Sequence, residues 1–87
     1  MVSQIIENIK QELMKQEPEM RITKIIELNE ENNYINIAVI VEDSDFVKTY
    51  AYSRNTMQFD EYCLTTNDMF KIAMELMKSK MISNHIL

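Results

Sequence analysis

The chain has 87 residues, of which 46% are apolar and 26% are charged, and its formal net charge is −5 at pH 7. This length supports one hydrophobic core, and this composition excludes an intrinsically disordered chain. The complete absence of glycine excludes the glycine-rich loops that cradle nucleotide phosphates.

The chain opens with an amphipathic segment. Apolar residues recur at helical spacing from Ile5 to Leu13, and they predict a helix over residues 3–17. Pro18 cannot continue the helical hydrogen-bond ladder, and it disfavours helical geometry at Glu17. We therefore expect the helix to end at that point.

Three segments that alternate apolar and polar side chains come next. They predict strands over residues 20–28, 34–42 and 46–53. The middle segment is partly apolar on both sides, which is typical of a central strand. Between the first two strands, asparagine can adopt the left-handed backbone that glycine usually supplies, so residues 29–33 predict a hairpin turn.

The last third of the chain contains a clear helix start. Thr65 and Asp68 match a capping box, and they predict a helix over residues 66–81 followed by a frayed tail over residues 83–87. Residues 57–64 leave two alternatives open, because they suit either a short fourth strand or a segment that covers the end of the core.

Together these elements predict one α+β domain over residues 1–87, in the order α-β-β-β-α. We expect a three-stranded antiparallel meander, with a fourth strand left open, and both helices packed on one face of the sheet.

The same element order occurs in double-stranded-RNA-binding domains, which the chain resembles in layout alone. Those domains begin their last helix with basic residues that contact phosphates. Here the last helix opens with Asn67, Asp68, Met69 and Phe70, so we expect no direct nucleic-acid binding.

Residues for catalysis or for metal binding are scarce. His85 is the one histidine and lies in the predicted tail, which is too mobile to hold it near Cys63 or any serine. Asp43 and Asp45 lack the glycine and the terminal glutamate of a calcium loop. We therefore expect neither an enzyme nor a cofactor or metal site.

The compartment is suggested by the N-terminus and by the single cysteine. The first residues have no basic start and no long apolar run, so we expect no signal peptide and no membrane contact. Cys63 has no second thiol to pair with, and we expect it to be half-buried in a reduced, cytoplasmic protein.

Acidic residues concentrate in the middle of the chain, where residues 27–68 contain nine acids against Lys48 and Arg54. A meander would gather them at both ends of the sheet and favour a basic partner, such as a nucleic-acid-binding enzyme. The residues expected to contact it are Glu30, Glu31, Glu42, Asp43, Asp45, Tyr50, Tyr52, Asp60 and Glu61. Alternatively, these acids serve solubility alone.

The predicted C-terminal helix is apolar over an arc of about 200°, about twice what one sheet contact needs. Either the N-terminal helix packs alongside and covers the excess, or the excess forms a homodimer interface. For the second alternative we expect the dimer face to contain Phe70, Met74 and Met81.

The sequence therefore predicts a non-enzymatic, small acidic protein-binding domain. In size, acidity and compact mixed fold it resembles the small anti-CRISPR and anti-restriction inhibitors of phages. That resemblance implies an inhibitor that mimics nucleic acid and blocks a basic, nucleic-acid-handling host protein. The alternative is a homodimeric structural or regulatory protein, assembled through the methionine-rich C-terminal helix.

Overall fold

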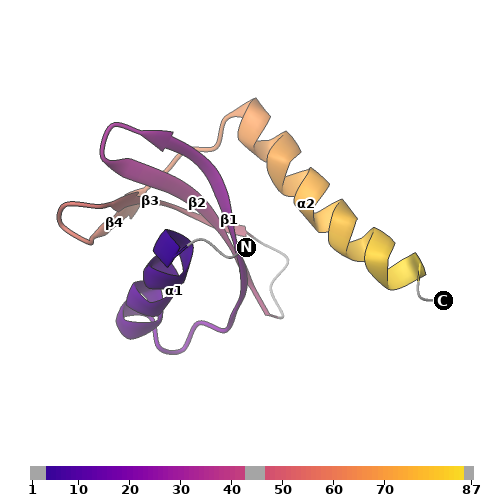
Figure 1. Ribbon diagram of the computed structural model, residues 1–87, viewed down its shortest axis with the longest axis horizontal. Helices are drawn as coiled ribbons and strands as arrows, with labels where there is room; N and C mark the ends of the chain where they lie inside the picture. Colours follow the sequence, from indigo (N-terminus) through magenta and orange to yellow (C-terminus); the bar gives the residue numbers. More distant parts are fainter. Residues whose placement is uncertain (1–3, 43–46, 86–87) are drawn as a thin grey trace.

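A helix, four strands and a second helix follow one another along the chain (Figure 1). The computed structural model describes residues 4–42 and 47–85, with side chains up to residue 78. The elements are α1 (Gln4–Gln16), β1 (Ile22–Glu31), β2 (Tyr34–Val41), β3 (Val47–Ser53), β4 (Phe59–Glu61) and α2 (Thr66–His85). The predicted α+β class and element order are confirmed.

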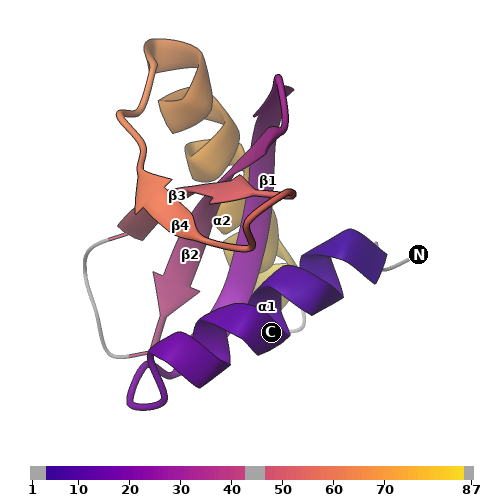
Figure 2. The same ribbon diagram turned by 90° about the vertical axis from the view of Figure 1, so that its left-hand side faces the viewer.

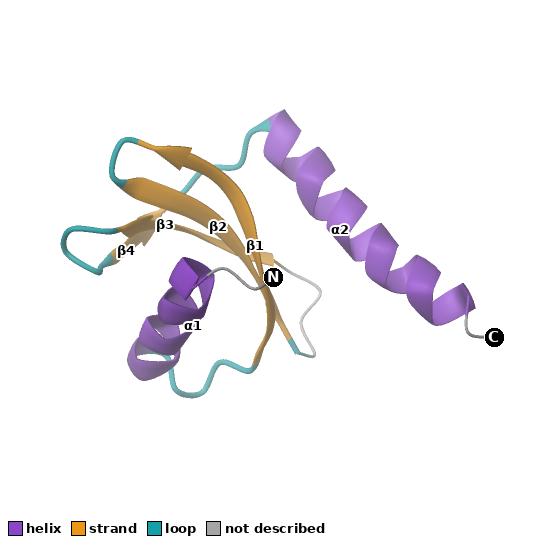
Figure 3. Ribbon diagram, viewed as in Figure 1, coloured by secondary structure: helices purple, strands orange, loops and turns teal. Residues whose placement is uncertain are grey.

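The four strands form one antiparallel sheet in the order β1-β2-β3-β4 (Figure 3). Each strand pairs with its neighbour in sequence, as a meander requires. The open question over residues 57–64 is answered by β4, in which Phe59 lies opposite Tyr52 and Glu61 lies opposite Tyr50.

Two elements run further than the sequence pattern predicts. β1 continues through Glu31, because a bulge between Glu27 and Asn29 carries the polar residues after Leu28 into the ladder. The turn to β2 then needs only two residues. α2 reaches His85 instead of ending at residue 81, so residues 83–85 belong to the helix and not to a frayed tail.

β2 is buried on both of its faces. Ile35, Ile37 and Val39 point to one side of the sheet and are fully buried, while Ala38 points to the other side and is equally buried. A strand buried on both faces needs a separate cover on each side. The two apolar clusters of the domain therefore lie on opposite faces of the sheet.

Each helix covers one of these faces, which corrects the expectation that both pack on the same face. Ile9 and Leu13 of α1 join the cluster around Ile35, whereas Ile72 of α2 joins the cluster around Ala38. Figure 2 shows α1 in front of the sheet and α2 behind it. The sequence showed that β2 is apolar on both sides, but not that each side takes its own helix.

Another expectation is also corrected. Cys63 is exposed, not half-buried, because the segment between β4 and α2 runs over the surface.

Two turns use a left-handed backbone without glycine. Asn32, in the β1–β2 turn, has a φ of 56°, as the asparagine run predicted. Met57 has a φ of 59° in the turn between β3 and β4, where its amide donates to the Ser53 carbonyl at 2.8 Å. Methionine has no side-chain group that favours this conformation, so the turn carries backbone strain.

Relief of this strain gives a first prediction. We expect Met57→Asn to raise the free energy of unfolding by about 0.5–1 kcal/mol, because asparagine tolerates the left-handed region better than methionine. Met57 is half exposed, so little packing is lost. Urea denaturation measures the change. Gln58→Asn, at a neighbouring exposed position without a positive φ, is the matched control, and an equal gain in both variants would contradict the explanation.

Candidate protein-interaction surface

The side of α2 that faces away from the sheet is apolar and exposed. Its four large side chains are each more than half exposed, at 55% for Met69, 65% for Phe70, 60% for Met74 and 58% for Met77. With Ala73, which is also exposed, they span an arc of roughly 140° at helical spacing. These five residues are called the outer face of α2 below.

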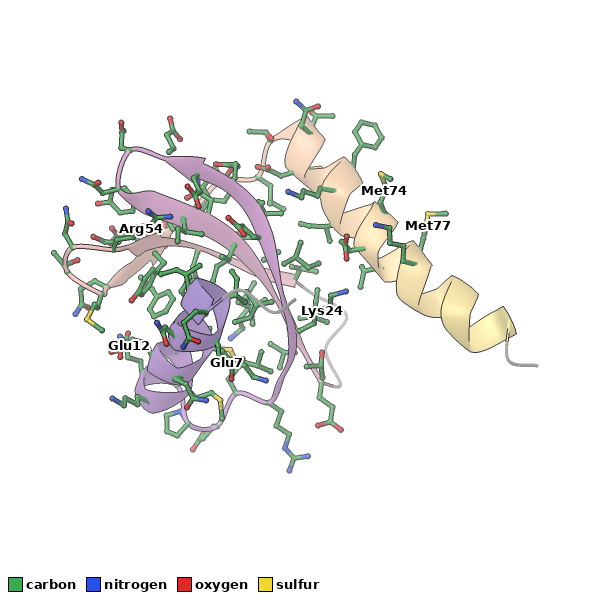
Figure 4. The ribbon with its side chains drawn as sticks, in the orientation of Figure 1. Glu7, Glu12, Lys24, Arg54, Met74 and Met77 are labelled. Carbon is green, nitrogen blue, oxygen red and sulfur yellow. The ribbon has the colours of Figure 1, made fainter. Side chains whose placement is uncertain are left out.

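The described side chains of α2 that contact the sheet lie on the opposite side of the helix. Ile72 is 7% exposed and packs in the cluster on the α2 face of the sheet. The Lys71 ammonium donates to the Leu28 carbonyl at 3.1 Å, and Lys24 pairs with Glu75 at 3.1 Å. In Figure 4, Lys24 lies between the sheet and the helix while Met74 and Met77 project away. The packing of α2 on the sheet therefore leaves the outer face uncovered.

The exposed apolar area is that of the largest patch on an ordinary monomer, although this chain has only 87 residues. A large side chain presents about 150–250 Å² when fully exposed, so the outer face offers roughly 500 Å². The largest apolar patch on an ordinary monomer is about 300–600 Å² and is often functional. Leaving 500 Å² in water forgoes on the order of 10 kcal/mol of transfer free energy. The outer face is therefore a candidate site for protein binding.

The first of the two alternatives for the surplus apolar surface is wrong. α1 cannot pack alongside α2, because the sheet lies between the two helices. The predicted dimer residues Phe70 and Met74 lie on the outer face, and the side chain of Met81 lies outside the described residues. Sequence reasoning missed Met69 and Met77, although the same helical projection includes both once Ile72 is known to face the sheet.

The spacing along the outer face is that of a helix-pairing seam. Phe70, Met74 and Met77 follow one another at intervals of four and three residues, and in the sequence Met81, whose side chain lies outside the described residues, comes four residues later. Alternating intervals of three and four bring side chains onto one stripe that a second helix can pack against.

A polar network fixes the beginning of α2 on the sheet. Asp68 is 5% exposed and accepts hydrogen bonds from the Tyr62 hydroxyl, from the Asn29 amide at 3.1 Å and from the Thr65 backbone amide at 3.0 Å. The Thr65 hydroxyl accepts from the Asp68 amide in return at 3.2 Å, which confirms the predicted capping box. Asn36 on β2 donates to Asn29 at 2.7 Å and extends the network to the central strand.

The network also controls two protonation equilibria. Burial raises the pKa of Asp68, but the hydrogen bonds from Tyr62, Thr65 and Asn29 outweigh it and leave the pKa below its ordinary value. Burial, together with the hydrogen bond to Asp68, raises the pKa of the Tyr62 hydroxyl. Asp68 is therefore a carboxylate and Tyr62 a neutral phenol at neutral pH, which suits a structural hydrogen bond.

The acidic residues expected to bind a partner are only partly brought together. Glu30 pairs with Arg54 at 2.8 Å, and Glu42 lies 3.8 Å from Arg21. Asp43 and Asp45 lie outside the described residues. The expected concentration of charge is therefore reduced at each end of the sheet by one ion pair.

Three other predicted acids line a pocket of about 300 Å³ beside the β1–β2 turn. They are Glu31, Asp60 and Glu61, and the remaining lining residues are Asn32, Tyr34, Asn36, Ala51 and Tyr62. Among the side chains that the structure describes, no lysine or arginine forms an ion pair with these three acids. Their role in binding stays a prediction.

The two tyrosines expected at the interface face the core instead. Tyr52 is 3% exposed and belongs to the cluster under α1, and Tyr50 is half-buried against the same cluster. Both contact Phe59, with ring centroids 5.0 Å apart for Tyr52 and 5.5 Å for Tyr50. Because α1 covers this side of β3, the two rings pack within the domain.

A metal-binding cluster and a membrane-spanning helix are both absent from the described residues. Within residues 4–42 and 47–85, no group of three His, Cys, Asp or Glu side chains is arranged to hold a metal ion. No helix in the same residues combines the length and the apolar character that crossing a bilayer requires.

Comparison of the chain with protein-family models, with curated proteins and with solved structures gives no match.

The Asp68 network gives a second prediction, on pH dependence. A carboxyl group whose pKa is lower in the folded than in the unfolded state stabilises the fold fully above its unfolded pKa, which is near 3.8 for aspartate. That stability is lost as the pH falls through the folded pKa. We expect Asp68→Asn to lower the free energy of unfolding at pH 7 by roughly 1.5–3 kcal/mol and to flatten the acid limb below pH 4.

Urea denaturation at a series of pH values measures both effects. Asp60→Asn, at an exposed acid outside the network, is the matched control and should keep the acid limb of the wild type. An acid limb of the same steepness in the Asp68 variant would contradict the assignment.

Proposed function

We propose that this chain is a non-enzymatic protein-binding domain whose docking surface is the outer face of α2. The observation that carries the proposal is the exposure of Met69, Phe70, Met74 and Met77 on a helix whose other side is tied to the sheet. Methionine-rich apolar surfaces adapt to a partner and are over-used at binding sites. Aromatic side chains such as Phe70 are enriched in interfaces as well.

A membrane surface is a poorer candidate for the same face. Helices that lie in the membrane interface usually carry lysine and arginine on their polar side, and anionic lipids attract that charge. Lys71 and Lys78 are each engaged within the domain, by the Leu28 carbonyl and by Glu75, and the chain carries a net charge of −5. Electrostatics thus favours a protein over an anionic bilayer.

The acidic surface supports a second candidate function, an inhibitor that occupies the basic site of a nucleic-acid-handling protein. The observation in its favour is the pocket at which Glu31, Asp60 and Glu61 meet. Association driven by these charges weakens as salt is raised, whereas association through the outer face of α2 does not. Binding at low and at raised salt therefore separates the two candidates.

The first candidate predicts where a partner is captured. We expect a photo-reactive benzoylphenylalanine at position 77 to form protein adducts in cells at least several-fold more efficiently than the same group at position 11. Gln11 is an exposed helical position on α1, so it controls for random encounters. Denaturing gels and mass spectrometry measure the adducts, and equal yields at the two positions would contradict the docking surface.

A further inference from the structure

Resting on the proposed function, we propose that the occupant of the outer face is a second copy of this chain. The two α2 helices pair antiparallel about a two-fold axis that passes between Met74 and Met77. A two-fold interface of this kind uses the same surface on both copies, so that surface has to be self-complementary.

The seam on α2 meets this requirement. Its intervals of four, three and four residues read the same in both directions along the helix. Antiparallel pairing therefore places Met74 opposite Met77 of the second copy, and Phe70 opposite position 81. Methionine side chains are flexible, so Met74 and Met77 can pack against each other in several rotamers. The centre of the helix pair therefore does not require one exact fit.

The exposed apolar side chains supply more than half of the area that a dimer needs. Each partner in a standard interface contributes about 800 Å². The exposed apolar side chains supply roughly 500 Å² of this in each copy. The rest has to come from the helix backbone and from polar side chains at the rim of the seam. A second helix has access along the whole seam, since α2 stands at one side of the domain with its outer face turned away from the sheet (Figures 1 and 4).

The charges beside the seam favour a second copy over an acidic partner. Lys71 donates to the Leu28 carbonyl of the sheet, and Lys78 lies 3.5 Å from Glu75 of the same helix, so both lysines have an acceptor within the domain. They do not form a cationic rim that would select an acidic helix. Over residues 69–78, where side chains are described, an apolar seam whose neighbouring lysines have acceptors within the domain associates mainly by burial.

This mode of association has a characteristic salt dependence. Each copy carries a net charge of −5, so two copies repel one another. Salt screens this repulsion, and the dimer should therefore become tighter as salt is raised. Docking of the acidic surface on a basic protein has the opposite dependence.

Light scattering coupled to size exclusion tests the proposal on the full chain. We expect twice the chain mass in the micromolar range, with a dissociation constant that falls several-fold between low and raised salt. Met74→Asp and the milder Met74→Gln should both shift the protein to the monomer, with circular dichroism unchanged because Met74 makes little contact within the domain. Met14→Asp applies the same change to an exposed methionine on α1 and should leave the dimer intact.

The outcomes separate this inference from the proposed function. The proposal of a second copy is overturned if the wild type stays monomeric into the millimolar range. It is also overturned if both Met74 variants leave the dimer unchanged. Adducts at position 77 that are heavier than two chains would then show a different protein on the same surface. Co-sedimentation with vesicles of phosphatidylcholine and phosphatidylserine, without any protein adduct, would overturn both proposals.

Discussion

The two-sided burial of β2 is the constraint on which the rest of the structure depends. Ile37 needs a cover on one face of the sheet and Ala38 needs a cover on the other, and the chain has one helix for each. Because the sheet then separates α1 from α2, neither helix can shield the other. α2 buries its inner side and keeps a second apolar side in water. The exposed outer face is thus a consequence of the topology and not of poor packing.

The polar network around Asp68 fixes the position of α2 on the sheet, and with it the position of the outer face. A buried carboxylate that accepts three hydrogen bonds holds the first turn of α2 in one position, since any displacement would leave a charge unsatisfied in the interior. Lys24 and Glu75 add a contact further along the helix. α2 is therefore held on the sheet from Asp68 to Glu75, while its outer face projects into solvent. A helix held in this way loses little further freedom when it binds a partner.

Most of the fold could be predicted from the sequence, because most helix ends, turns and strands are determined by residues close together in the chain. Pro18, the asparagine turn and the Thr65–Asp68 capping box each act within a few residues, and strand alternation needs no knowledge of distant contacts. The choice of sheet face for each helix depends on long-range packing, so it was predicted incorrectly. The same holds for Tyr52. It was expected to contact a partner, but it lies on the sheet face that α1 covers. The network of Asn29, Asn36 and Tyr62 carries no periodic signal and was missed.

Hydrogen exchange in α2, followed as the protein concentration is raised, tests the central claim most directly. If a second copy covers the outer face, the backbone amides of residues 69–77 should exchange more slowly at high than at low concentration. The amides of α1 should not change, because that helix is already covered by its own sheet. Exchange in α2 that is independent of concentration would contradict the account.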